Sequence, residues 1–139
     1  MKRILFISHR IPFPPNKGDK IRSYSIIKSL KKLGHSIDLA FLVDDPDDIK
    51  YIPQLERTFG HIYYGLLNKF DARLLAALSY FTFIPASILY FYHKGLKQKI
   101  EDASENNQYD VIFYFSGASL NYFMPSSRER NIIDFVDID

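Results

Sequence analysis

The feature that most constrains the fold lies near the start of the chain, where two apolar runs flank a proline-rich loop and a helical pattern. Residues 3–8 (RILFIS) form a short apolar run, which is typical of a central strand in a parallel sheet. Residues 9–18 contain three prolines and a glycine, so no regular element can cross them. Residues 19–33 repeat apolar side chains at helical spacing, and residues 36–43 (SIDLAFLV) predict a second strand. This order predicts a right-handed βαβ unit with parallel strands.

The rest of the chain continues the alternation of strands and helices. Three further strands are expected, over residues 61–67, 109–116 and 131–138. The intervening segments predict a loop and a short helix interrupted at Pro53, a mostly helical region over 69–103 broken near Pro85, and a short helix over 117–124. The pattern therefore predicts an α/β fold, a Rossmann-like, doubly wound and mostly parallel sheet in one domain spanning 1–139. Because the last strand runs to the end of the sequence, we expect the chain to be a fragment of a larger protein.

Composition excludes several classes of protein. Hydrophobic residues make up 47% of the chain, which excludes a disordered tail, and the absence of cysteine excludes disulfides, thiol catalysis and thiolate metal sites. The formal net charge of +2 is too small to indicate binding to nucleic acid. The first apolar run is too short for a signal peptide, so we expect a cytoplasmic protein.

The loop over 9–18 and the start of the following helix form the strongest candidate binding site. In a parallel sheet this turn lies at the ligand edge, where backbone N–H groups and the helix dipole attract anions. Gly18 is expected to adopt a left-handed conformation and allow a close approach, and Asp19 to cap the helix or accept a hydroxyl hydrogen bond. Three cationic side chains would add charge: Lys17, Lys20 and Arg22. The alternative is an ordinary loop with solvated lysines. The fingerprints of NAD and ATP sites, G-x-G-x-x-G and Gly-Lys-Ser/Thr, do not occur.

Residues 9–24 also resemble a known family. They read His-Arg-x-Pro-x-Pro-Pro-x-Lys-Gly-Asp-Lys-x-Arg-x-Tyr, which is similar to the start of GT-B glycosyltransferases of the family 4 type, above all the sugar transferases associated with exopolysaccharide and PEP-CTERM systems. VDDPDD at 43–48 and DFVDID at 134–139 resemble further segments of these proteins. Many relatives carry Gly-Gly where this chain has Lys17-Gly18.

The resemblance implies a two-domain enzyme that transfers a sugar from a nucleotide diphosphate sugar, with retention and without a metal or other cofactor. This chain would be the acceptor-binding N-terminal domain, and the nucleotide-binding C-terminal domain would be absent from it, so the isolated chain should be inactive. The acceptor would be a saccharide or a lipid-linked molecule. The implied site residues are His9 as the catalytic residue, Lys17, Gly18, Asp19 and Arg22 for the donor phosphates, and Arg10, Asp44 and Asp137 for the acceptor.

Residues 74–92 carry no formal charge and contain many aromatic side chains. Pro85 and several polar residues argue against a membrane span, so a helical hairpin is expected. It could pack against the sheet, or present an apolar surface to an acceptor or to the inner face of a membrane, where the neighbouring Lys94, Lys97 and Lys99 would suit anionic headgroups.

Two other functions fit the sequence. One is a non-catalytic, phosphate-responsive α/β binding or regulatory module of receiver-like topology. The acidic pocket of such a module needs aspartates right after the first strand, so Ser8-His9-Arg10 at that position counts against it. The other is a membrane-surface adaptor that uses residues 74–99. The scattered histidines His35, His61 and His93 lack the spacing of metal ligands.

Overall fold

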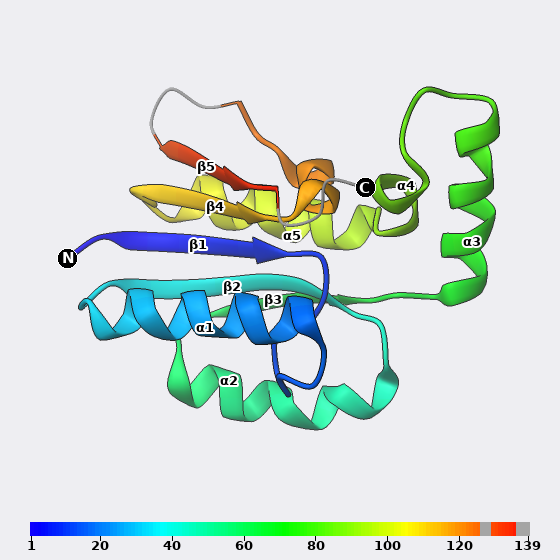
Figure 1. Ribbon diagram of the computed structural model, residues 1–139. Helices are drawn as coiled ribbons and strands as arrows, with labels where there is room; N and C mark the ends of the chain where they lie inside the picture. The colour runs from blue at the N-terminus through cyan, green and yellow to red at the C-terminus, as the bar shows by residue number, and fades with distance from the viewer. Residues whose placement is uncertain (126–128, 136–139) are drawn as a thin grey trace.

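The computed structural model describes residues 1–125 and 129–135, which form a five-stranded parallel sheet in the order β3-β2-β1-β4-β5 (Figure 1). The strands are β1 (Arg3–Ser8), β2 (Ser36–Val43), β3 (Ile62–Leu66), β4 (Val111–Phe115) and β5 (Arg130–Asp134). The strand order reverses between β1 and β4, which is the switch point where doubly wound sheets bind ligands. The Rossmann-like fold predicted from the sequence is confirmed.

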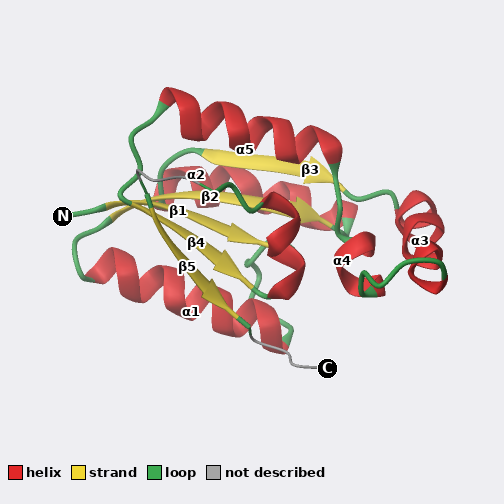
Figure 2. Cartoon of the chain, turned by 90° about the horizontal axis from the view of Figure 1, so that it is seen from above, coloured by secondary structure: helices red, strands yellow, loops and turns green. Residues whose placement is uncertain are grey.

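Helices cover both faces of the sheet (Figure 2). On one face lie α1 (Gly18–Lys32), the 3₁₀ helix η1 (Pro46–Tyr51) and α2 (Ile52–Thr58), and Ile27 and Leu55 pack there against Phe6 and Phe41. On the other face lie α5 (Lys94–Asn106) and the 3₁₀ helix η3 (Gly117–Tyr122), whose side chains pack against the opposite side of β1 and β2. The central strands are therefore buried on both faces, as their continuous apolar sequences indicate.

Helix α1 agrees with the predicted range to within one residue at each end. It starts at Gly18 after an extended Lys17, and it stops because Gly34 adopts a left-handed conformation with φ of 93°. The Gly34 N–H donates to the carbonyl of Lys31, which satisfies one of the last carbonyls of the helix. Gly34 therefore provides the C-terminal stop of the helix.

Three local expectations need correction. Pro53 does not interrupt a helix but lies in the first turn of α2, where its missing N–H costs no hydrogen bond. The short helix expected over 117–124 is a 3₁₀ helix that ends at Tyr122. The last strand ends at Asp134, and Asp137, expected to contact the acceptor, lies outside the described residues.

The segment that we call the arm, residues 69–90, joins β3 to α5. It contains α3 (Lys69–Ala77), the 3₁₀ helix η2 (Leu78–Tyr80) and α4 (Ala86–Tyr90). Helix α3 makes its principal contacts with α4, and Figures 1 and 2 show the arm beyond the carboxyl ends of the strands. Within residues 1–125 and 129–135, no helix has the length and apolar character needed to cross a bilayer.

Candidate functional site

A cleft of about 600 Å³ opens at the carboxyl ends of β1 and β4, where the strand order reverses. Its lining is partly polar and partly apolar. The polar residues include His9, Arg10, Asp19, Ser87 and Ser116, and the apolar residues include Pro85, Ile88, Phe91, Leu120 and Phe135. The cleft therefore offers hydrogen bonds to one part of a ligand and an apolar surface to another.

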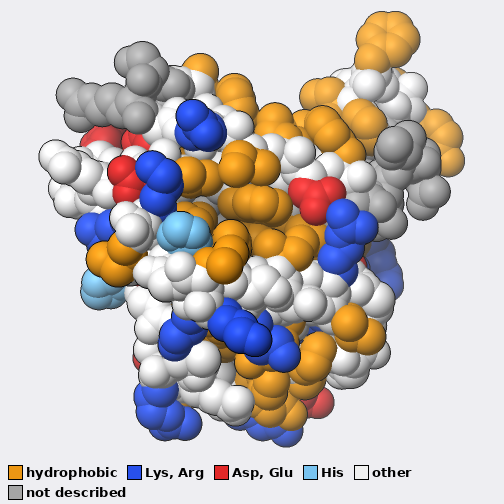
Figure 3. Space-filling model, turned by 60° about the vertical axis from the view of Figure 1, so that its left-hand side comes forward, with side chains coloured by type: hydrophobic (Ala, Val, Ile, Leu, Met, Phe, Trp, Pro, Cys, Tyr) orange, Lys and Arg blue, Asp and Glu red, His pale blue; other side chains and the backbone are white. Residues whose placement is uncertain are grey.

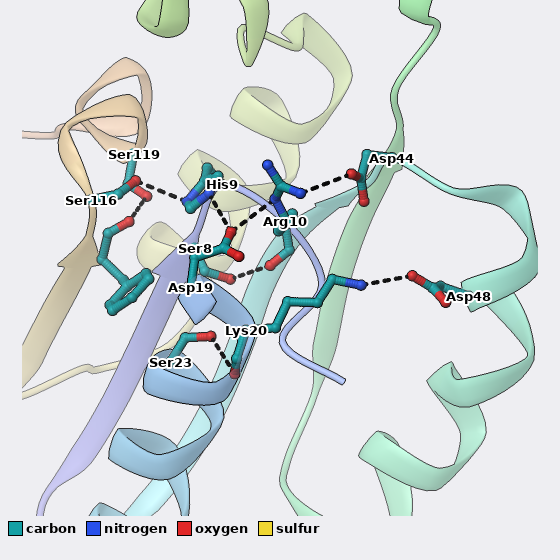
Figure 4. Close-up of polar contacts among 11 residues, drawn as sticks. Ser8, His9, Arg10, Asp19, Lys20, Ser23, Asp44, Asp48, Ser116 and Ser119 are labelled. Carbon is teal, nitrogen blue, oxygen red and sulfur yellow. Dashed lines mark hydrogen bonds and ion pairs between the residues drawn. The ribbon is translucent and has the colours of Figure 1, made fainter. Parts of the chain in front are cut away.

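The sheet register brings His9 and Ser116 together. Ser8 pairs with Phe115 in the β1–β4 ladder, so the residues that follow them lie side by side at the end of the sheet. The His9 Nδ1 atom lies 2.9 Å from the Ser116 hydroxyl, and the His9 Nε2 atom lies 2.9 Å from the Asp19 carboxylate (Figure 4). Since a carboxylate can only accept, Nε2 carries a proton, and in the neutral imidazole Nδ1 accepts from Ser116. The three residues thus form a hydrogen-bonded chain that lines the cleft.

Asp19 is held ionised in this chain. The hydrogen bond from His9 lowers its pKa to about 2 against the opposing effect of burial, and the Arg10 guanidinium adds to this lowering. The expectation that Asp19 caps α1 was wrong, because the cap position is Lys17 and Asp19 lies in the first turn. A carboxylate there still interacts favourably with the helix dipole.

Arg10 is fixed by two carboxylates. Its Nε atom lies 2.9 Å from Asp19, and its NH1 atom lies 3.3 Å from Asp44. The Ile11 N–H donates to the carbonyl of Leu42 at 2.8 Å, which holds the loop after β1 over β2 and brings Arg10 to Asp44. Asp44 contacts Arg10 and does not line the cleft, and its Oδ1 atom is buried without a hydrogen-bond partner among the described residues.

The residues expected to bind the donor phosphates lie outside this cleft, apart from Asp19. Lys17 and Gly18 are exposed at the start of α1. Gly18 has no positive φ, so the expected left-handed conformation is absent there, although a Cβ at this position would meet no atom within 4 Å. The open space around Gly18 leaves the start of the helix accessible to a ligand.

Two of the expected cations are held by carboxylates. The Arg22 guanidinium donates to both oxygens of Asp134, at 3.0 and 3.1 Å. Lys20, expected to add charge at the turn, is only 2% exposed, and its ammonium lies 2.8 Å from the carboxylate of buried Asp48 (Figure 4). Lys20 therefore joins α1 to η1 and does not face a ligand.

Ser116 belongs to the candidate site but was not predicted from the sequence. Its φ is 77°, a backbone conformation that non-glycine residues rarely adopt, and it is almost fully buried. The available clue was its place as the last residue of the predicted strand 109–116, followed by Gly117. A polar residue at the carboxyl end of a parallel strand points to the ligand edge, but only the register with β1 shows that it meets His9.

The remaining histidines and the lysines near the arm have other positions. The His93 Nδ1 atom accepts from the Leu96 N–H at 2.9 Å and so caps α5. Lys99, expected to meet lipid headgroups, donates instead to the carbonyl of Tyr64 at 2.7 Å. Among the residues that the structure describes, no group of three or more His, Asp or Glu side chains could hold a metal ion.

Comparison of the chain with protein-family models, with curated proteins and with solved structures gives no match to any of them. A functional assignment therefore depends on the cleft and on the motif of residues 9–24.

Proposed function

We propose that this chain is the acceptor-binding domain of a glycosyltransferase that transfers a sugar from a nucleotide diphosphate sugar to a saccharide or lipid-linked acceptor, with retention. The observation that carries the proposal is the cleft at the switch point with its mixed polar and apolar lining, which the glycosyltransferase-like motif helps to build. Sugars present hydroxyl groups at their edges and C–H groups on their faces. The polar lining residues of the cleft suit the hydroxyl groups, and Ile88 and Phe91 suit the C–H faces.

His9 would bind the reacting hydroxyl of the acceptor. In the structure its Nδ1 atom accepts from the Ser116 hydroxyl, and a rotation of that hydroxyl would make Nδ1 available to the acceptor. The ionised Asp19 carboxylate would stabilise positive charge on the imidazole if a proton moved to it. Arg10 would hold the acceptor through the part of its guanidinium that Asp19 and Asp44 leave unengaged.

The donor diphosphate would approach the exposed start of α1. Lys17 would supply charge, the open backbone around Gly18 would supply N–H groups, and Arg22 would add a cation already oriented by its carboxylate partner. A second, nucleotide-binding domain would complete the site, so the chain alone should bind an acceptor but transfer no sugar. We place the protein in the cytoplasm.

The proposal is tested by titrating the ¹⁵N-labelled chain with methyl glucoside, cellobiose and maltose and following amide NMR shifts. We expect shifts that map to the cleft around Ser116 and Phe91. His9→Ala should weaken the affinity about tenfold to a hundredfold, the effect of losing one hydrogen bond to a polar or charged group. The matched control is His61→Ala, since His61 is exposed and precedes β3 at the opposite edge of the sheet. A folded chain that shows no cleft shifts with any of these sugars would contradict the proposal.

A second function, acyl transfer from an ester, is favoured by one observation, the Ser116–His9–Asp19 chain. Ser116 Oγ would attack the ester carbonyl while His9 Nδ1 takes its proton, and the departing alcohol would take that proton back to leave an acyl-serine. Water would then hydrolyse the acyl-serine with the same base. Covalent labelling by a fluorophosphonate probe, lost in Ser116→Ala, would support this function. Absence of labelling in the folded chain would exclude it.

A further inference from the structure

The outer face of α3 is an exposed apolar stripe. Phe70, Leu74 and Leu78 are 69%, 58% and 47% exposed, and their spacing of four residues places them on one side of the helix. None of them contributes to either hydrophobic core of the domain. Such a stripe is unusual on a surface that meets only water, and it indicates an interaction surface.

The stripe leads into an aromatic tip at residues 80–84. Tyr80, Phe81 and Phe83 are almost completely exposed, and hydrophobic side chains project from the upper right of the molecule in Figure 3. The turn satisfies its own polar groups, because the Phe81 N–H and the Thr82 hydroxyl both donate to the Leu78 carbonyl, and the Ile84 N–H donates to the Thr82 hydroxyl. Internal hydrogen bonds lower the cost of moving a backbone turn out of water.

The charge around the arm is positive. Lys69 and Arg73 are also four residues apart on α3, and they lie in sequence directly before Phe70 and Leu74, so a cationic row flanks the apolar stripe. Lys94 and Lys97 follow the arm at the start of α5, whereas Asp71 is the single carboxylate between residues 69 and 99. An apolar stripe beside cations is the pattern of a helix that lies at a membrane interface.

We propose that the arm docks on the surface of an anionic phospholipid bilayer, with the aromatic tip inserted at the boundary between headgroups and acyl chains. A bilayer supplies both the negative charge and the apolar area that the arm requires, while a second copy of the chain would bring its own cations against Lys69 and Arg73. Charge complementarity therefore favours a bilayer over a second copy of the chain.

Docking also bears on the acceptor, a step that depends on the proposed function. Ile88 of α4 lines the cleft, and the Phe91 ring that follows α4 packs edge-on against His9 at 4.9 Å between ring centres. Because the arm continues into the cleft wall, a docked arm would place the cleft beside the bilayer. Of the two acceptor classes, the lipid-linked one is then favoured, with its apolar part along α4 and its hydroxyl at His9.

Vesicle co-sedimentation tests the docking. We expect the full chain to sediment with vesicles of phosphatidylcholine and phosphatidylglycerol in equal parts, and much less with phosphatidylcholine alone. Replacing both Phe81 and Phe83 by Ser should reduce the partition coefficient about tenfold or more. Lys69→Gln with Arg73→Gln should reduce it by a similar factor and weaken its salt dependence, because each cation near the surface contributes separately.

Matched controls come from exposed residues far from the arm in sequence. Leu33 is 74% exposed at the end of α1, so Leu33→Ser controls for loss of apolar surface. Lys2→Gln with Lys32→Gln controls for loss of charge, since both side chains are exposed. Both controls should leave vesicle binding unchanged, and an equal loss in them would overturn the proposal.

Two other results would also overturn it. One is no sedimentation with anionic vesicles. The other is concentration-dependent dimerisation without lipid, abolished by the Phe81/Phe83 double variant in analytical ultracentrifugation, which would show that a second copy covers the arm. The saccharide titration is independent of these results, so a failure of docking and a failure of the proposed function can be told apart.

The choice of a lipid-linked acceptor is tested with octyl glucoside below its micelle concentration. Tighter binding of octyl glucoside than of methyl glucoside to the cleft would support the lipid-linked acceptor, and equal affinities would contradict it.

Discussion

Lys20 gives the sharpest test of the structure, because its sequence context predicts a solvent-facing cation and the structure places it inside the protein. The ammonium and the Asp48 carboxylate lie 2.8 Å apart, with Lys20 2% and Asp48 7% exposed. At an effective dielectric constant of about 20, this separation corresponds to an attraction of about 6 kcal/mol. Desolvation of the two ions offsets most of it, so the intact pair contributes little net stability.

Removing one partner alone has a much larger effect. Lys20→Met keeps the apolar stem of the side chain but leaves the Asp48 carboxylate buried without its counter-ion, which should lower the free energy of unfolding by about 3–5 kcal/mol. That is a large fraction of the roughly 5–15 kcal/mol typical of a whole domain. Replacing both partners, as in Lys20→Met with Asp48→Leu, should restore stability to within about 1 kcal/mol of the original chain.

Urea unfolding followed by far-UV circular dichroism measures these differences, with an unchanged m-value as the sign that only stability has changed. Saccharide binding by the double variant should equal that of the original chain, since Lys20 does not line the cleft. The reasoning is refuted if Lys20→Met costs less than about 1 kcal/mol and at the same time weakens pyrophosphate binding. Lys20 would then face a ligand, as the sequence suggested.

Three further predictions concern single positions. Asp19→Asn should lower the free energy of unfolding by about 1 kcal/mol near neutral pH, a figure reduced for the partial exposure of the carboxylate. Because the pKa of Asp19 is about 2 in the fold and 3.8 normally, urea titrations should show this loss almost in full above about pH 4, and the loss should disappear as the pH falls through about 2. Burial, with Lys99 nearby, lowers the pKa of His93 below 6.5. The chain should therefore lose stability, relative to the His93→Asn variant, as the pH falls through 6.5. Thermal melts at several pH values measure this loss. Gly65→Ala should lower the free energy of unfolding by about 1–3 kcal/mol, because the added Cβ would lie 2.8 Å from the His93 ring. The ring cannot move away without losing its hydrogen bond at the start of α5. An unchanged midpoint of urea unfolding would contradict the placement of that ring.

The elements near the start of the chain could be predicted closely because their sequences carry local information. Strands β1 and β2 are continuous apolar runs, and α1 has helical spacing with a glycine stop, so each element is defined by residues within it. The region over 69–103 was predicted as broken helix, and it is. That the arm stands away from the sheet could not be predicted, since an apolar helix has the same sequence pattern whether it packs in a core or lies on a surface.

The candidate site was predictable only in part, because its contacts join segments far apart in the sequence. His9 and Arg10 follow β1 at the ligand edge, a position that topology alone indicates. The partner of His9 at Nδ1 is 107 residues away, and the partner of Lys20 is 28 residues away. Contacts between residues so far apart produce no periodic pattern in a single sequence. The local charge of the loop therefore did not predict which cationic side chains remain exposed.

The same pairings decide which ligand this domain can hold by itself. Asp19 and Asp44 neutralise Arg10, and Asp134 engages Arg22. Much of the positive charge at the carboxyl edge is therefore already balanced by carboxylates of the same chain. A site of this kind suits a neutral, hydroxyl-rich ligand better than a diphosphate, which carries charge that Lys17 and a helix start can meet only in part. The balance of charge thus supports the proposed division of roles, in which this domain would bind the acceptor and a second domain would supply most of the contacts to the donor phosphates.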